Sequence, residues 1–156
     1  MILIQPFVGL LLASLASAVV AANETEIEKY LGDYRQKSFT SCFVGENNEM
    51  SRCDVENLLA IERKSADSFH VSFIVYGANF HVCEMSGDAT VRAGKLEHRY
   101  FSENLSGGKL ACVLTLELDE AGVILKADSN MSCKSWFCGQ RAGFDGHRFY
   151  LREMEK

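Results

Sequence analysis

The fold is decided by the stretch Leu110-Ala111-Cys112-Val113-Leu114-Thr115-Leu116-Glu117-Leu118. From Cys112 onward an apolar residue stands at every second position, and polar residues such as Thr115 and Glu117 fall between them. An alternation with a period of two is typical of a β-strand that buries one face. We therefore predict a core strand over residues 110–118.

The same alternation recurs elsewhere, most clearly in 69–76, where Phe69, Val71, Phe73 and Val75 share one face. Shorter strands are predicted at 39–44, 55–63, 80–85, 89–92, 96–101 and 123–127, with turns at 45–48, 77–79, 86–88, 93–95 and 119–122. Residues 55–63 also fit a helix, but the β-rich surroundings favour a strand. Short strands joined by tight turns predict a mainly β, antiparallel meander. Such a meander closes into a barrel or packs as a sandwich, because open edges invite aggregation.

The N-terminus predicts an exported protein. Residues 1–22 contain an uncharged apolar run from Phe7 to Val20, followed by small residues at a plausible cleavage point. We predict a signal peptide over 1–22 and one disulfide-bonded β domain over 23–156, in a secreted or periplasmic protein. The alternative is a short membrane anchor, but the run barely reaches the roughly 20 residues that a span needs. No stable membrane span is expected after cleavage.

A short helix is predicted at the start of the mature domain. Thr25 and Glu28 have the spacing of a capping box. Ile27, Tyr30 and Tyr34 then fall on one helical face, so the predicted helix precedes the first strand.

All six cysteines lie in the mature part of the chain. An even number of cysteines in an exported domain predicts three disulfides, although six thiols permit 15 pairings. The sequential pairing closes the most local loops and is favoured: Cys42–Cys53, Cys83–Cys112 and Cys133–Cys138. Zinc is the competing explanation, but no Cys-x-x-Cys pair occurs, so neither a metal nor another cofactor is predicted.

The formal net charge of −5 argues against a broad nucleic-acid-binding surface. No nucleophile elbow, zinc-protease helix, phosphate loop or dinucleotide fingerprint occurs. The chain is therefore not expected to be an enzyme. Because catalytic triads are assembled in space, the enzyme alternative stays open, with Asp145, His147 or Arg141 as its candidate groups.

The segment 132–149 is the most distinctive part of the sequence, because it concentrates aromatic and basic residues around two cysteines. Rigid aromatic side chains beside arginine are common in binding hot spots. The candidate binding residues are Trp136, Phe137, Arg141, Phe144, Asp145, His147 and Arg148. The alternative is structural: Trp136 and Phe137 plug one end of the barrel, and 145–146 is only a turn.

The chain resembles the small calycin-like barrels in its predicted signal peptide, its β-meander and its disulfides. That group includes lipocalins and bacterial lysozyme inhibitors. Gly32-Asp33-Tyr34 is similar to the Gly-x-Trp that opens a lipocalin barrel, with Tyr in place of Trp. The segments 80–83, 86–89 and 138–146 resemble uncharacterised bacterial exported proteins. The Ser-Gly-x-x-Tyr element of periplasmic lysozyme inhibitors is absent, since Asp88-Ala89-Thr90 follows Ser86-Gly87. The resemblance implies a barrel but carries over no inhibitory contact.

Two functions follow as expectations. The first is an exported protein-binding module, such as an inhibitor or immunity protein against a cell-wall hydrolase like lysozyme, whose basic charge the acidic domain would attract. The alternative is a carrier of a small apolar ligand. For the carrier, the side chains that would line the cavity are Phe69, Phe73, Phe80, Leu114 and Leu116, and these residues can equally fill a solid core.

Overall fold

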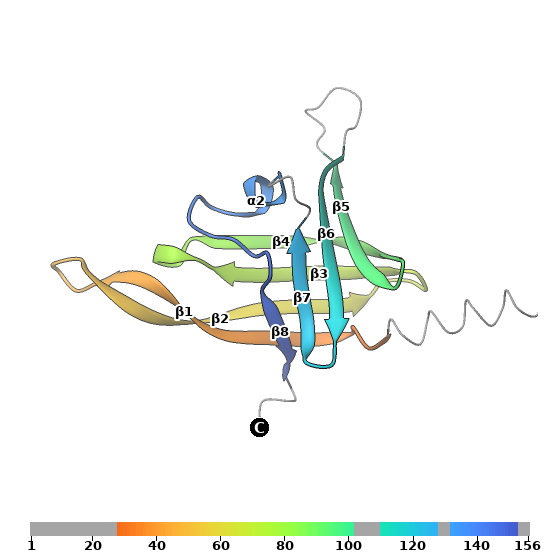
Figure 1. Ribbon diagram of the computed structural model, residues 1–156, viewed down its shortest axis with the longest axis horizontal. Helices are drawn as coiled ribbons and strands as arrows, with labels where there is room; N and C mark the ends of the chain where they lie inside the picture. The colour runs from red at the N-terminus through yellow and green to blue at the C-terminus, as the bar shows by residue number, and fades with distance from the viewer. Residues whose placement is uncertain (1–27, 102–109, 128–131, 153–156) are drawn as a thin grey trace, which may run out of the picture.

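Eight antiparallel strands form a closed barrel in the computed structural model, which describes residues 28–101, 110–127 and 132–152 (Figure 1). Each strand pairs with the next one along the chain, and the last pairs with the first. The strands are β1 (Gly32–Val44), β2 (Glu49–Arg63), β3 (Ser68–Tyr76), β4 (Val82–Arg92), β5 (Lys95–Phe101), β6 (Leu110–Asp119), β7 (Gly122–Ala127) and β8 (Arg148–Leu151). The predicted meander and its barrel closure are confirmed.

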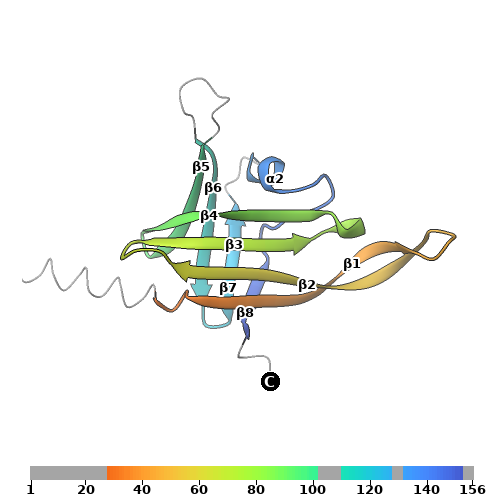
Figure 2. The same ribbon diagram turned by 180° about the vertical axis from the view of Figure 1, so that it is seen from behind.

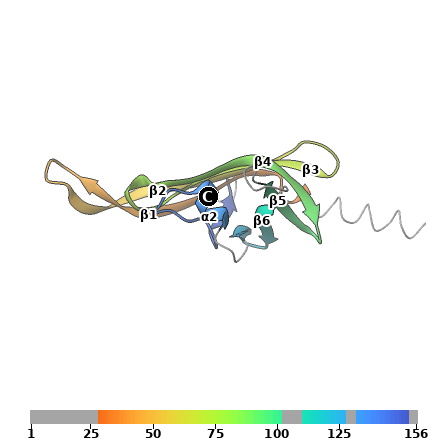
Figure 3. The same cartoon turned by 90° about the horizontal axis from the view of Figure 1, so that it is seen from above.

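The barrel is flattened into two layers whose strands cross (Figures 1 and 3). The strands β1 to β4 form one layer, and β5 to β8 run across them. The alternating residues predicted to face the core do so, since Phe69, Val71, Leu114 and Leu116 are all fully buried. Burial of these apolar side chains stabilises the closed barrel.

The first two strands extend well beyond the barrel as a two-stranded ribbon (Figures 1 and 2). β2 pairs with β3 only from Leu58 to Arg63, and β1 pairs with β8 only at Tyr34 and Arg35. Residues 36–44 of β1 and 49–57 of β2 therefore find their strand partners in each other. The turn predicted at 45–48 joins them at the tip.

Two sequence predictions about local structure are wrong. The predicted N-terminal helix does not reach Tyr34, because β1 begins at Gly32; its first residues, 25–27, lie outside the described part of the chain. The predicted turn at 86–88 is continuous β4 instead. Gly87 stands there because the His98 ring packs against its Cα, at 2.6 Å from where a Cβ would lie.

A short helix that the sequence did not predict, α2 (Ser132–Phe137), packs against the barrel near β4 and β6. A short 3₁₀ turn, η1 (Ala78–Phe80), joins β3 to β4. Among the described residues no helix is both long and apolar enough to cross a membrane.

The cysteines form three disulfides, but two of the predicted pairings are wrong. Cys42–Cys53 is confirmed. Cys83 pairs with Cys138, and Cys112 pairs with Cys133. Both corrected bonds fasten the α2 segment to the barrel, because Cys133 lies in α2 and Cys138 directly follows it. Residues distant in sequence meet where this helix packs on β4 and β6. Three disulfides indicate an oxidising, extracytoplasmic environment.

Candidate functional site

The aromatic residues predicted for binding are divided between surface and core. Trp136 is exposed and packs on Tyr100, with 5.0 Å between ring centroids. Phe137 is half-buried between Tyr100 and Phe144. Phe144 is buried against Phe73, with centroids 5.2 Å apart, so it belongs to the core and is not a surface contact.

The polar members of the predicted set do not form one cluster of free groups. Arg141 is exposed, and its carbonyl accepts a hydrogen bond from the Ala78 N–H. The Asp145 carboxylate accepts one from the Ala127 N–H at 2.9 Å. Arg148 pairs with Asp119, and this hydrogen-bonded ion pair lowers the pKa of the Asp119 carboxyl. These groups hold the C-terminal segment in place.

His147 lies where the ribbon leaves the barrel, in a polar cluster with Gln36 and Asn57. Its Nδ1 is 2.7 Å from Gln36 Oε1, which also accepts from Asn57 Nδ2 at 2.8 Å. Asn57 is fully buried, and its Oδ1 accepts from the Tyr76 N–H where β3 ends. The Asn57 side chain thus replaces the backbone acceptor that β2 no longer supplies to this end of β3. Burial lowers the pKa of His147, although a hydrogen bond with the Gly143 backbone opposes the shift.

The lowered His147 pKa predicts a loss of stability on acidification. The unfolded chain binds a proton at this residue near the ordinary pKa of about 6.5, whereas the folded chain binds it only at lower pH. Stability should therefore be full above that value and fall as pH drops towards the folded pKa. Unfolding free energies measured between pH 5 and 7.5 should show this slope in the native protein and a weaker slope in His147→Gln. Equal slopes in the two proteins would exclude His147 as the cause.

The largest gathering of exposed apolar side chains is on the ribbon. Four of the nine large apolar side chains exposed in the described part of the chain lie there: Phe39, Phe43, Val44 and Met50. Phe43 and Met50 are cross-strand partners, and Phe39 shares their face because it lies four residues from Phe43 along β1. Met50 is 72 % exposed and Phe43 51 %. Apart from the Arg52 side chain on Phe39, nothing in the described structure covers this face of Phe39, Phe43 and Met50, which we call the ribbon face.

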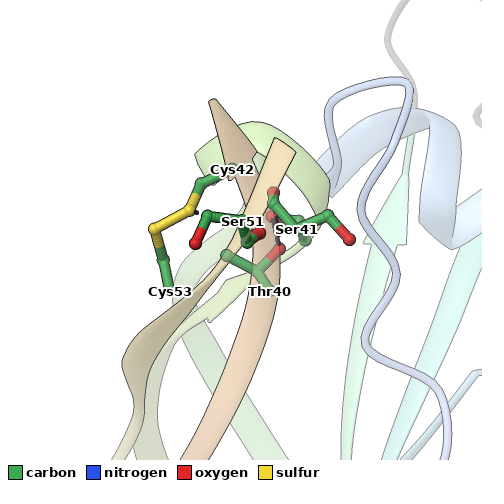
Figure 4. Close-up of a disulfide and its surroundings, with 6 residues drawn as sticks. Thr40, Ser41, Cys42, Ser51 and Cys53 are labelled. Atoms are coloured by element: carbon green, nitrogen blue, oxygen red, sulfur yellow. Dashed lines mark hydrogen bonds between the residues drawn. A yellow bond between two sulfur atoms is a disulfide. The ribbon is translucent and has the colours of Figure 1, made fainter. Parts of the chain in front are cut away.

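The opposite side of the ribbon is held rigidly. The Cys42–Cys53 disulfide links its two strands, and the Cys42 side chain lies beside Ser51 (Figure 4). Thr40 is buried and donates a hydrogen bond to the Gly77 carbonyl at 2.6 Å, which fastens the ribbon to the turn after β3. The ribbon face is therefore presented on a braced hairpin.

Charged side chains surround the ribbon face. The Arg52 guanidinium stacks on the Phe39 ring, 3.5 Å from its centroid. A shallow groove of about 780 Å³ runs alongside, with Lys37, Asp54 and Glu56 among its lining residues. By strand alternation this face carries the acidic Asp54 and Glu56 and the basic Lys37 and Arg52, and Glu56 also pairs with Arg35 at 3.1 Å. The face is thus apolar at its centre, with charges of both signs at its margin.

The side chains proposed to line an internal cavity mostly fill the barrel. Phe69, Phe73, Leu114 and Leu116 belong to the buried core, whereas Phe80 is half exposed outside it. The carrier hypothesis therefore gains no support from these residues and stays a prediction. Among the described residues, no group of three or more His, Cys, Asp or Glu side chains is arranged to hold a metal.

The ribbon face was not predicted from the sequence, although a signal was present. Phe43 and Met50 flank a polar turn between two cysteines, a pattern that places apolar residues at the tip of a disulfide-linked hairpin.

Comparisons of the chain with protein-family models, curated proteins and solved structures returned no match. The functional interpretation therefore depends on the geometry of this chain alone.

Proposed function

We propose that the protein is an exported protein-binding module that engages a cationic partner, such as a secreted cell-wall hydrolase, through the ribbon face. The observation that carries the proposal is the cluster of Phe39, Phe43 and Met50, exposed together on a disulfide-braced hairpin. A contiguous exposed apolar patch with a polar rim is typical of an interaction site. Inhibition of the hydrolase would follow if the ribbon face covers the partner's substrate cleft.

Two physical features support this assignment. The brace limits the conformational freedom that the hairpin loses on binding, so more of the contact energy appears as affinity. The net charge of −5 attracts a basic partner and speeds association. Raised salt should therefore slow association more than it speeds dissociation.

The double variant Phe43→Ser/Met50→Ser tests the ribbon face. Removing two central apolar contacts should cost about 3 kcal/mol of binding energy, which is more than a hundredfold in Kd. The immobilised domain would first be used to capture hydrolases from cell-envelope extract, with loss of lytic activity measured on isolated cell walls. Variants are then compared against the retained hydrolase by surface plasmon resonance.

The matched control is Phe101→Ser, which removes an aromatic ring of similar exposure from the end of β5. It should leave binding unchanged. Trp136→Ala forms the third arm, because Trp136 is an exposed member of the set of binding residues predicted from the sequence. If Trp136→Ala loses binding and Phe43→Ser/Met50→Ser does not, the binding site is at α2 and not on the ribbon face. Failure to retain any hydrolase, with no loss of lytic activity, would refute the proposed function.

A further inference from the structure

Three polar side chains on the outer surface of β3 and β4 form a hydrogen-bonded relay. Ser86 Oγ lies 3.0 Å from His70 Nε2. His70 Nδ1 in turn lies 3.4 Å from Asp88 Oδ1. The order serine, imidazole, carboxylate is that of an activated nucleophile, its general base and the group that orients the base.

The strand register explains why these side chains meet. His70 pairs with Asp88 and Ser72 pairs with Ser86 across the β3–β4 ladder. The Asp88 carbonyl accepts a hydrogen bond from His98 of β5, so it points away from β3. Both pairs are therefore non-hydrogen-bonded pairs, in which the side chains approach most closely.

The Asp88 carboxylate of the relay is also paired with a lysine. Lys64 Nζ contacts Asp88 Oδ2 at 2.5 Å, and the hydrogen bonds from Lys64 and His70 lower the pKa of the Asp88 carboxyl. Asp88 is thus ionised at neutral pH and accepts the Nδ1 proton of His70. That tautomer leaves Nε2 free to accept the proton of Ser86. Glu62 is the cross-strand neighbour of His70 on β2.

A groove with an apolar side leads to Ser86. It has a volume of about 470 Å³, within the usual range of ligand pockets. Leu58, Ala60, Ser72, Ile74 and Ser86 are among its lining residues; Leu58 pairs with Ile74, Ala60 with Ser72, and Ser72 with Ser86. The charged residues Asp33, Arg35, Glu84 and Arg152 complete its polar side. Small residues at 60, 72 and 86 leave a trough beside the larger Leu58 and Ile74. An apolar acyl chain in this trough would have its carbonyl carbon near Ser86 Oγ.

We propose that Ser86 is the nucleophile of an acyl-transfer site for esters of small apolar acids, with His70 as its general base and Asp88 as a positioning residue. Ser86 Oγ attacks the ester carbonyl carbon while His70 Nε2 takes the hydroxyl proton. The intermediate expels the alcohol oxygen, which receives that proton, and leaves an acyl-serine. Water, deprotonated by His70, then releases the acid and restores the hydroxyl. This activity is independent of the proposed binding function.

The test uses p-nitrophenyl hexanoate and a serine-directed fluorophosphonate with the full chain. The native protein should release nitrophenolate above the rate in buffer and gain one phosphonate adduct, located on Ser86 by peptide mass spectrometry. Ser86→Ala should lose the adduct, and both Ser86→Ala and His70→Gln should lower hydrolysis about 100-fold or to background. Ser65→Ala is the matched control, since Ser65 is an exposed serine that hydrogen-bonds to the Asp67 carboxylate outside the groove; it should retain labelling and rate.

Asp88→Asn distinguishes positioning from structural support. It should lower kcat and leave KM unchanged, because the amide no longer holds the His70 ring with Nε2 free to accept the Ser86 proton. Thermal melting should be nearly unaffected, since the pair is exposed. Equal labelling of native protein and Ser86→Ala, or no hydrolysis above buffer by the native protein, would overturn the proposal.

Discussion

Replacing Cys83 and Cys138 together with alanine is expected to lower the free energy of unfolding by about 4 kcal/mol. The bond joins residues 55 positions apart, the longest of the three separations, so its loss frees the largest loop in the unfolded chain. Such a domain has a total stability of about 5–15 kcal/mol, so the melting temperature should fall sharply. Urea unfolding followed by circular dichroism measures the change.

The Cys42→Ala/Cys53→Ala variant is the control for this prediction. Its loop spans only 11 residues and lies in the ribbon, so the loss should be nearer 3 kcal/mol. The Cys42→Ala/Cys53→Ala variant should lose partner binding. The Cys83→Ala/Cys138→Ala variant should bind normally under conditions in which it remains folded. If removing the Cys42–Cys53 bond costs more stability than removing the Cys83–Cys138 bond, the dependence on loop length is contradicted.

Phe144→Ala is expected to destabilise the fold by about 4 kcal/mol. Phe144 is 2 % exposed and packs between Phe73 and Phe137, so truncation leaves a cavity in the barrel core. Equilibrium unfolding gives the loss, and Phe144→Leu should recover more than half of it because it refills most of the volume. Trp136→Ala, which removes an exposed ring, should cost far less. Similar losses for the two alanine variants would show that Phe144 is not a core residue.

The strand pattern was predictable because burial of one face imposes a period of two. The alternation in 69–76 and 110–118 needed no knowledge of distant residues, and both segments are strands. Local composition misled at Ser86-Gly87-Asp88, where the glycine serves the approach of His98 from β5. A requirement imposed by a neighbouring strand cannot be detected within a short window of sequence.

The disulfide pairing and the candidate sites depend on the same long-range information. Cys133 and Cys138 are close in sequence, yet α2 directs them to different strands. Ser86, His70 and Asp88 meet only through the β3–β4 register, and no motif in the sequence identifies them. The expectation that the protein is not an enzyme therefore stays a prediction, and the Ser86 experiment is its direct test.

The disulfide pairs also determine how the protein must acquire its covalent structure. A chain that enters an oxidising compartment from its N-terminus first exposes Cys42 and Cys53, which are native partners. The next two thiols to emerge are Cys83 and Cys112, and each has its native partner further along the chain. An oxidase that joins thiols in order of appearance would produce a crosslink that must later be exchanged. Maturation of this protein should therefore depend on a thiol–disulfide isomerase, with an oxidase alone giving scrambled product.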